Sequence, residues 1–237
     1  MAKIMEKVKG FYNEKVLRKF NNALKKAIEL VKSGEDLRVR ISNKNSKMGE
    51  VASVSLLPFL TCPDCCKTTC GKKCYAAKLA NMRKQSLFAY AINTALVMCR
   101  PDVFWAQVNA AVMAVRFFRF HVSGDIINMD YFLHMIEIAK NNPYTEILVF
   151  TKRYSVVNEW IDKNGKLPEN LHILFSGWKD LDPINPHNLP ETNVILKGEE
   201  TFPENWKICG GNCFNCACRG LGCWKAAAGE VIAFHEH

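Results

Sequence analysis

The chain has 237 residues, of which 49% are hydrophobic and 23% charged, a composition that fits a globular protein and excludes a disordered one. It contains no apolar run approaching roughly eighteen residues and no signal-peptide pattern after Met1, so we expect no membrane span and a cytoplasmic location. The net charge of +9 is uneven, because residues 1–84 carry +12 and residues 85–237 carry −3.

The basic N-terminal segment, residues 1–50, contains a predicted amphipathic helix over residues 11–31, where apolar residues recur three or four positions apart. The pair Ser33-Gly34 is a stop signal for this helix. A cationic helix face predicts contact with nucleic acid through counterion release, although a solvated helix face would account for it equally well. The lysines of this face are Lys15, Lys19, Lys25, Lys26 and Lys32.

The rest of the chain alternates strand-like and helix-like segments. Strand-like apolar runs lie at residues 37–42, 51–60, 117–123, 146–151, 171–176, 193–197 and 231–235. Helical periodicity is found at residues 76–98, 101–115, 129–140 and 156–163, whereas residues 178–190 and 209–223 are predicted to be irregular. This alternation predicts an α/β protein with either a partial, mostly parallel β/α barrel or an open sheet. No linker is evident, so we expect a single domain, with a core over residues 51–200 and a Cys-rich tail over residues 201–237.

Eleven cysteines in a chain expected in a reducing compartment predict metal ligands rather than disulfides. The first cluster runs from Cys62 to Cys74, where Pro63 and Gly71 favour a loop that turns back on itself over a continuous helix. Thiolates can converge in such a loop, and a helix is expected to begin near Cys74. The predicted ligands are Cys62, Cys66, Cys70 and Cys74, with Cys65 as a substitute.

The second cluster, from Cys209 to Cys223, has five cysteines within fifteen residues. Its glycines would let the backbone approach a bound cluster closely, and Phe214 and Trp224 would shield that cluster from water. The predicted ligands are Cys209, Cys213, Cys216 and Cys223, with Cys218 as a substitute. The two clusters together predict one or two [4Fe–4S] clusters.

Zinc is the alternative metal. Cys62 with Cys65, and Cys213 with Cys216, have the spacing of the two halves of one four-thiolate zinc site. Such a site would leave seven of the eleven cysteines unused, which favours iron–sulfur ligation.

Polar side chains follow two of the predicted strands directly. Because the carboxyl ends of parallel strands form one rim where ligands bind, we expect these side chains to position a substrate or cofactor. Lys152 and Arg153 would suit an anionic ligand such as a carboxylate or phosphate. The alternative interpretation is that Asp125 caps the next helix and His121 is a hydrogen-bonded core residue. The candidates are His121, Ser123, Gly124, Asp125, Lys152 and Arg153.

The order of these motifs over residues 55–237 resembles the gene product 88 family of phages and mobile elements. The resemblance implies an iron–sulfur protein and adds no mechanism of its own. It rests on Cys74-Tyr75-Ala76, Phe120-His121-Val122-Ser123-Gly124-Asp125-Ile126, Phe150-Thr151-Lys152-Arg153 and Cys223-Trp224.

A more distant similarity is to radical S-adenosylmethionine (SAM) enzymes, which share a cysteine loop after an early strand, a Cys-Tyr pair and a partial parallel β/α barrel. It implies SAM as a cofactor, with Ser123, Gly124, Asp125 and Lys152 as the residues that would bind it. The cysteine spacing departs from that pattern. The Cys-x3-Cys-x2-Cys spacing of those enzymes is absent from the first cluster and occurs instead after the strands, at Cys209, Cys213 and Cys216.

We therefore expect a radical-SAM-like iron–sulfur enzyme that acts on nucleic acid or a nucleotide. The alternative is a non-catalytic nucleic-acid-binding accessory protein whose iron–sulfur or zinc sites only order its loops. Affinity for SAM would favour the enzyme, and salt-dependent nucleic-acid binding without SAM affinity would favour the alternative.

Overall fold

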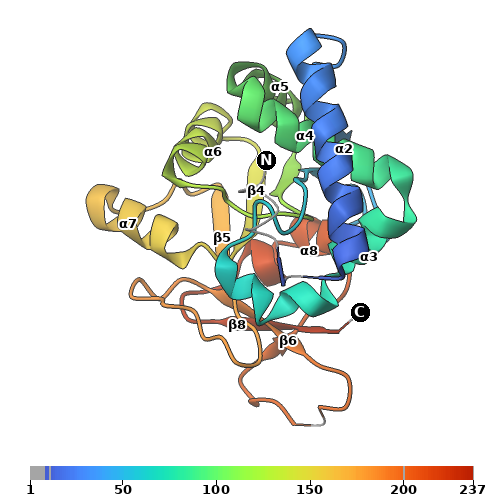
Figure 1. Cartoon of the computed structure of the whole chain (residues 1–237). Helices are drawn as coiled ribbons and strands as arrows, with labels where there is room; N and C mark the ends of the chain where they lie inside the picture. The colour runs from blue at the N-terminus through green and yellow to red at the C-terminus, as the bar shows by residue number, and fades with distance from the viewer. Residues whose placement is uncertain (1–8, 11, 200, 237) are drawn as a thin grey trace.

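The computed structural model describes residues 9–10, 12–199 and 201–236, and its strands form one open sheet in the order β1-β2-β3-β4-β5-β6-β8-β7 (Figure 1). All neighbouring strands are parallel except β1 and β2. The strands are β1 (Ile41–Ser42), β2 (Ala52–Val54), β3 (Phe117–Phe120), β4 (Glu146–Thr151), β5 (Leu171–Ser176), β6 (Glu191–Ile195), β7 (Lys207–Ile208) and β8 (Val231–His235). The helices are α2 (Glu14–Ser33), α3 (Tyr75–Met82), α4 (Lys84–Cys99), α5 (Pro101–Met113), α6 (Met129–Asn141), α7 (Tyr154–Asn164) and α8 (Cys213–Cys218), with 3-10 turns η1 (Asp64–Lys67), η2 (Cys70–Lys73) and η3 (Gly222–Trp224).

The centre of the sheet confirms the predicted β-α-β-α-β alternation. β3, β4 and β5 pair side by side in parallel, and α6 and α7 connect them in sequence. Their apolar side chains are buried on both faces, as parallel strands require when both faces of a sheet are covered. The mostly parallel α/β fold expected from the sequence is therefore present.

The two faces of the sheet are covered by different parts of the chain. On one face, Phe118, Val149 and Ile173 pack in a core cluster with the residues of α2 and α4 to α7. On the other face, Leu148 packs in a second cluster with Trp224 of the C-terminal segment. Because successive strand residues point to opposite faces, β3, β4 and β5 serve both clusters.

Helix α2 forms as the amphipathic pattern predicts, although the first residue of the predicted range, Phe11, lies outside the described residues. The Asn13 side chain caps its first turn by accepting a hydrogen bond from the Lys15 backbone amide at 2.9 Å. Gly34 ends the helix in a left-handed conformation with φ 81°. Its apolar side buries Phe20 and Leu24 against the core, while most of its lysines are exposed.

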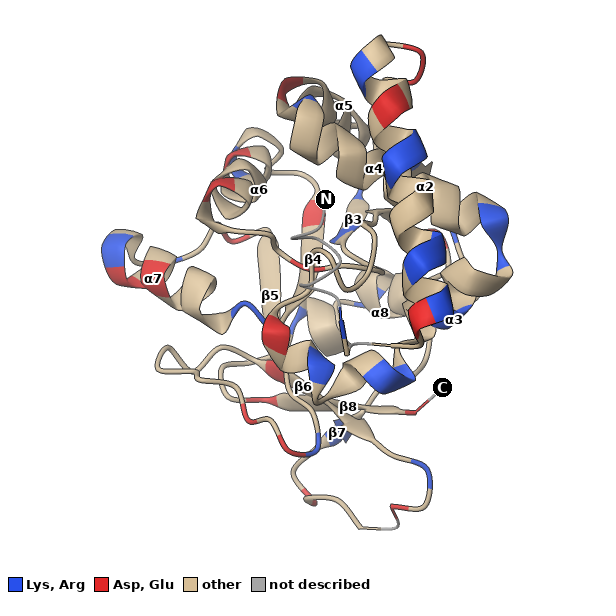
Figure 2. Ribbon diagram, in the orientation of Figure 1, with Lys and Arg blue, Asp and Glu red and all other residues tan. Residues whose placement is uncertain are grey.

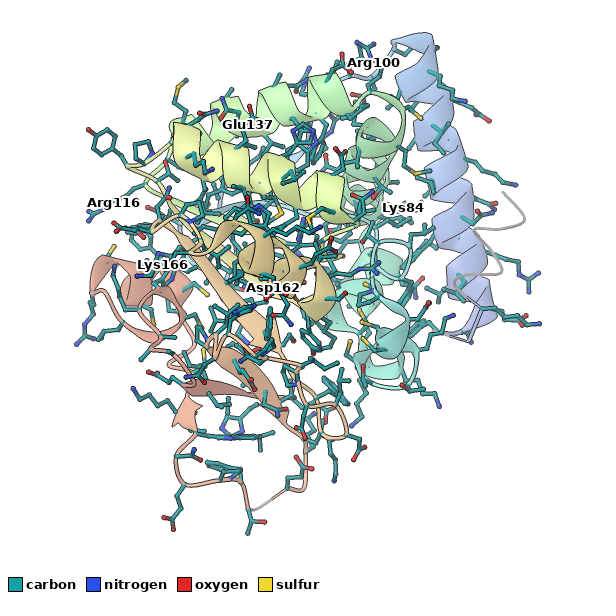
Figure 3. All side chains as sticks on the ribbon, turned by 90° about the vertical axis from the view of Figure 1, so that its left-hand side faces the viewer. Lys84, Arg100, Arg116, Glu137, Asp162 and Lys166 are labelled. Carbon is teal, nitrogen blue, oxygen red and sulfur yellow. The ribbon has the colours of Figure 1, made fainter. Side chains whose placement is uncertain are left out.

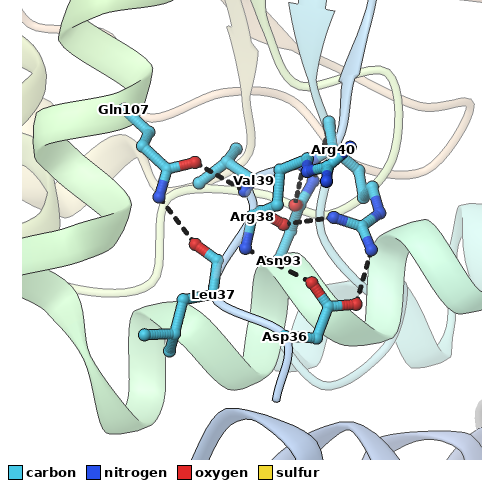
Figure 4. Close-up of polar contacts among 7 residues, drawn as sticks. All are labelled: Asp36, Leu37, Arg38, Val39, Arg40, Asn93 and Gln107. Atoms are coloured by element: carbon cyan, nitrogen blue, oxygen red, sulfur yellow. Dashed lines mark hydrogen bonds and ion pairs between the residues drawn. The ribbon is translucent and has the colours of Figure 1, made fainter. Parts of the chain in front are cut away.

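The predicted strand at residues 37–42 is reduced to β1, because side chains of α4 and α5 take the hydrogen bonds that a strand partner would take (Figure 4). Gln107 accepts from the Val39 amide at 2.9 Å and donates to the Leu37 carbonyl at 2.6 Å. Asn93 bonds the Arg40 amide and carbonyl in the same way, at 2.7 and 2.9 Å. Side-chain hydrogen bonds thus replace the ladder over most of this segment.

Three further boundaries differ from the sequence prediction. The helix predicted at residues 76–98 is two helices, α3 and α4, because the backbone of Arg83 between them is extended. The apolar run at residues 51–60 is a strand only at β2, because the chain then turns into the first cysteine loop. The segment at residues 209–223, predicted to be irregular, contains the short helix α8, capped by the Asn212 side chain on the Asn215 amide. The return of the chain as β8 is confirmed. Within the described part of the chain, every helix is too short or too polar to traverse a bilayer.

Candidate functional site

The first cysteine cluster lies in two consecutive 3-10 turns, η1 and η2, which lead into α3. Cys74 is the N-cap residue of α3, so the helix begins where the sequence predicts. The turns fold the loop back on itself, and Cys66 is buried, with 4% of its surface exposed. The loop packs with the core cluster on the helix-covered face of the sheet, whereas α8 packs with the cluster on the other face, and Figure 3 shows the two segments on opposite sides of the molecule. The two cysteine clusters are therefore separate sites.

Cys66 is the centre of the first cluster. Hydrogen bonding to Cys62, Cys65 and Cys70, together with burial, raises the pKa of its thiol. The same bonds to Cys66 lower the pKa of Cys65 to about 7 and that of Cys70 to about 6. The structure thus gathers the thiols of Cys62, Cys65 and Cys70 around the thiol of Cys66.

Cys74 is set somewhat apart from this centre. Burial raises its pKa to about 12, and the thiols that influence it further are Cys62 and Cys70. Cys65, which was expected only as a substitute ligand, is hydrogen-bonded to Cys66. The loop therefore offers five thiols, with Cys65 at least as central as Cys74.

The Ser123-Gly124-Asp125 turn lies beneath this loop. The Asp125 carboxylate accepts hydrogen bonds from the Thr151 hydroxyl at 2.6 Å, the Lys152 amide at 2.9 Å and the Ile126 amide at 2.7 Å. Burial nevertheless raises its pKa. The carboxylate thus joins the ends of β3 and β4 through contacts within the chain.

The side chains of Lys152 and Arg153 also form hydrogen bonds within the chain. The Lys152 ammonium donates to the Ser176 carbonyl and hydroxyl at 2.8 and 2.7 Å and to the Gly177 carbonyl at 3.1 Å. Arg153 Nε donates to the Ile126 carbonyl at 2.9 Å. The lysine is buried, and its charge favours the thiolate forms of Cys65 and Cys70. The rim residues are therefore brought together beside the first cluster, where they also hold the strand ends.

The sequence left open that Asp125 caps the next helix and that His121 is a core histidine, and the structure bears on both. Helix α6 is capped by Asn128, so the expectation that Asp125 caps it is wrong. His121 is buried and its Nε2 lies 2.8 Å from the Tyr131 hydroxyl, as a core histidine would be. Its Nδ1 has no partner among the described residues, and burial lowers its pKa to about 3. The Ser123 hydroxyl donates to the Leu56 carbonyl at 2.8 Å.

The second cluster gathers around α8 and η3 on the opposite face of the sheet. Burial is the main cause of the raised pKa values of Cys213 and Cys216. It also raises the pKa of Cys223 to about 12. Each of these thiols also interacts electrostatically with Cys209, whereas Cys218 is exposed. The Trp224 indole donates to the Cys213 carbonyl at 3.0 Å. The structure thus brings together the four cysteines predicted from the sequence.

Two basic residues beside the second cluster were missed by the sequence analysis. Arg119 lies on β3 between two phenylalanines, and its charge favours the thiolate forms of Cys213 and Cys223. Lys47 lies near Cys209 and Cys213, and burial lowers its pKa. A charged residue inside an otherwise aromatic strand was the available signal for Arg119, because such a residue needs a buried partner.

Within residues 9–10, 12–199 and 201–236, no three His, Cys, Asp or Glu side chains are placed to bind one metal ion. All eleven cysteines are free thiols. The two clusters are therefore groups of neighbouring thiols rather than preformed sites for one ion.

A basic surface lies on α2 and the turn between α3 and α4 (Figure 2). A shallow hollow in it is lined by Lys15, Arg18, Lys19 and Asn22. The Lys19 ammonium reaches across to Asn81 of α3. This surface exposes part of the excess positive charge of residues 1–84, and Lys72 and Lys73 of the first cysteine loop expose more of it.

Comparison with known protein families gives a match. The family described as gene product 88 matches the chain over residues 12–212, which includes the first cysteine cluster, the rim residues and Cys209. No curated protein and no solved structure matches the chain.

Proposed function

The chain belongs to the gene product 88 family, and from this premise we propose that it is an iron–sulfur protein of phage or mobile-element type. We propose further that it works as a radical-SAM-like enzyme on nucleic acid or a nucleotide. The observation that carries the proposal is the grouping of nine cysteines into two sets, Cys62, Cys65, Cys66, Cys70 and Cys74, and Cys209, Cys213, Cys216 and Cys223.

The first set fits a [4Fe–4S] cluster in number and chemistry. Such a cluster needs four thiolates, and the loop supplies five thiols around the buried Cys66. Lys152 lies close enough to favour thiolates at Cys65 and Cys70. A fifth thiol means that one cysteine is not needed as a ligand, and Cys65 and Cys74 are the two that compete for this place.

The second set fits a cluster because Arg119, which lies beside it, has no acidic partner among the described residues. Arg119 Nε is buried and has no hydrogen-bond partner among the described residues, and no carboxylate there pairs with the guanidinium. Arg119 as a whole is half-buried, and a partly desolvated cation is stabilised by a nearby anion. Cluster-bound thiolates at Cys213 and Cys223 would supply that negative charge.

The number of cysteines favours iron–sulfur clusters over zinc. One four-thiolate zinc site would use four of the eleven cysteines and leave seven without a role, whereas two [4Fe–4S] clusters would use eight.

When bound, a cluster at the first set would supply one-electron chemistry, which radical-SAM-like enzymes use to cleave SAM. The chain's own contribution is the rim next to the loop. Asp125 ties β3 to β4, and Lys152 ties β4 to β5, so the two residues keep the strand ends in register beneath the loop. We propose that His121, Ser123, Gly124, Asp125, Lys152 and Arg153 position the substrate or cofactor there.

The finer form of the fold is part of the same proposal. We propose that the sheet curves as a partial barrel, with the first cysteine loop at the carboxyl ends of its strands. The support is that the C-terminal segment packs on the face opposite the helices, which would be the inner face of such a barrel.

The test is anaerobic purification followed by iron, sulfide and zinc analysis. We expect iron and sulfide in stoichiometric amounts, about four of each for every cluster. Cys66→Ser should remove the first cluster and Cys213→Ser the second, while Cys218→Ser, the matched control, should remove neither. A colourless protein without iron or sulfide, or one that holds only zinc, would reject the proposal.

SAM binding tests the enzymatic part separately. We expect SAM to bind the iron-loaded protein, and we expect Cys66→Ser to abolish this binding while Cys213→Ser preserves it. Iron-loaded protein without measurable SAM affinity would leave the iron–sulfur assignment standing and reject the radical-SAM-like activity.

The basic hollow on α2 supports a second candidate, a non-catalytic accessory protein that binds nucleic acid. Its test is binding to labelled single- and double-stranded oligonucleotides at several salt concentrations. Each phosphate contact contributes a salt slope of about −0.7 to −0.9, so Lys15→Glu with Arg18→Glu should lower the affinity and flatten the slope. Salt-dependent binding without SAM affinity would favour this candidate.

A further inference from the structure

Arg119 is a cation on an aromatic strand, and it forms no ion pair with the described carboxylates. Its guanidinium carbon lies 4.5 Å from the centre of the Phe150 ring, and Nη1 donates to the Met48 sulfur at 3.4 Å. Both are weak partners for a guanidinium, and Nε has none among the described residues. The side chain is therefore held in place without being neutralised.

The turn at residues 45–49 connects Arg119 to the second cysteine cluster. The Met48 carbonyl accepts a hydrogen bond from the Phe214 amide in the first turn of α8, at 2.9 Å. Gly49 adopts φ 68°, and a side chain there would meet the Phe214 Cβ at 2.8 Å. The residue that holds the guanidinium is therefore packed directly against the residue that follows Cys213.

Lys152, the cation that acts on Cys65 and Cys70 of the first cluster, differs from Arg119 in its partners. The Lys152 ammonium beside it already donates to three oxygen atoms, and the Asp125 carboxylate lies close enough to oppose its effect on Cys65 and Cys70. At the second cluster, Arg119 acts on Cys213 and Cys223 without such opposition among the described acidic residues. The two clusters thus face different electrostatic environments.

We infer that Arg119 is the counter-cation of the cluster held by Cys209, Cys213, Cys216 and Cys223, and that it raises the reduction potential of this cluster above that of the first. This inference rests on the proposed iron–sulfur function. Reduction adds one negative charge to a cluster, and a neighbouring cation favours the more negative state. A nearby opposite charge shifts a comparable one-charge equilibrium, a proton dissociation, by roughly one to three powers of ten.

The test compares Arg119→Gln with Arg119→Lys, which keeps the charge. Arg116→Gln is the matched control, because Arg116 is exposed, stacks on Phe117 and points outward on the same side as α8 in Figure 3. Each protein is titrated anaerobically with dithionite, which is oxidised as each cluster gains one electron, and electron paramagnetic resonance follows both clusters. Cys66→Ser and Cys213→Ser assign the signals.

Arg119→Gln should lower the reduction equilibrium constant of the C-terminal cluster at least tenfold, a shift of about 59 mV to more negative potential for one electron. Arg119→Lys should restore most of the wild-type potential of the C-terminal cluster. Arg116→Gln should leave that potential unchanged, and the potential of the first cluster should be the same in all variants. If Arg119→Gln instead loses the C-terminal cluster, recovery of the iron content in Arg119→Lys supports the inference, and failure to recover overturns it.

An unchanged potential in Arg119→Gln, or an equal shift of both clusters, would overturn the inference while the proposed function stands. A second cluster with a lower potential than the first in the wild type would also overturn it. Wild-type protein without iron and sulfide would instead reject the proposed function itself, so the two failures are distinguishable.

Discussion

His121 shows how burial changes the chemistry of a single residue. Its ring is buried against Tyr131, and burial lowers its pKa to about 3, with Arg119 as a second cause. An unfolded chain would hold the same histidine near pKa 6.5. Between these values the unfolded state binds more protons than the folded state, so this residue makes the protein less stable as the pH falls below about 6.5.

We therefore predict that His121→Gln weakens the pH dependence of stability. The wild type should lose up to about 1.4 kcal/mol of unfolding free energy per pH unit below pH 6.5 through this group. The measurement is urea unfolding at pH 7, 6 and 5, with exposed His235→Gln as the control. Equal slopes in His121→Gln and the wild type would contradict the assigned pKa.

Gly124 is the residue on which the contact between the rim and the cysteine loop depends. It has φ 87°, and a Cβ there would lie 2.6 Å from the Thr61 hydroxyl and 2.8 Å from the Leu56 Cβ. Few side chains tolerate either the conformation or the contact.

We predict that Gly124→Ala lowers the unfolding free energy by about 2 kcal/mol or more. Gly210→Ala is the control, because that position has an ordinary φ and nothing within 4 Å of the added Cβ. Urea unfolding of both variants measures the difference. Equal stability of the two variants would show that the turn can relax away from Thr61.

At the scale of secondary structure, the segment before β1 is held by two helices rather than by a strand partner. Asn93 of α4 donates to the Arg40 and Ser55 carbonyls at 2.9 Å each and accepts from the Arg40 amide at 2.7 Å. This one side chain therefore joins the segment before β1 to the residue after β2.

We predict that Asn93→Ala lowers the unfolding free energy by about 3 kcal/mol, because three hydrogen bonds are lost and their partners stay buried. Gln85→Ala, an exposed change on the same helix, should alter it by less than about 0.5 kcal/mol. Denaturant unfolding distinguishes them. A small effect of Asn93→Ala would mean that water replaces the lost bonds.

Across the whole molecule, the sheet core and the cysteine loops depend on different interactions. The core around Phe118, Val149 and Ile173 is built from buried apolar side chains. The loops at residues 62–74 and 209–224 contain little regular structure beyond short turns and α8.

We predict that anaerobic removal of iron by a chelator makes residues 62–74 and 209–224 sensitive to limited proteolysis and leaves the far-ultraviolet circular dichroism largely intact. Cys218→Ser, which changes an exposed thiol, should behave like the wild type. Cooperative loss of the whole spectrum would show instead that the sheet depends on the metal.

The residue patterns were sufficient for much of the fold. The alternation of apolar runs after residue 117 predicted β3, α6, β4, α7 and β5 because periodicity reflects which face each element buries. The patterns were insufficient at two segments. At residues 37–42, hydrogen bonds from the Gln107 and Asn93 side chains decide the local structure, and at residues 209–223 the Asn212 cap does.

The sequence by itself determined the α/β class and the two cysteine-rich segments, because periodicity and spacing are local properties of the chain. Only the tertiary structure decided which groups lie together: Cys65 with Cys66, Lys152 with the end of β5, and Arg119 with Cys213. Some of these contacts join residues that are distant along the chain, and others depend on the local backbone conformation. The spacing of residues in the sequence specifies neither kind.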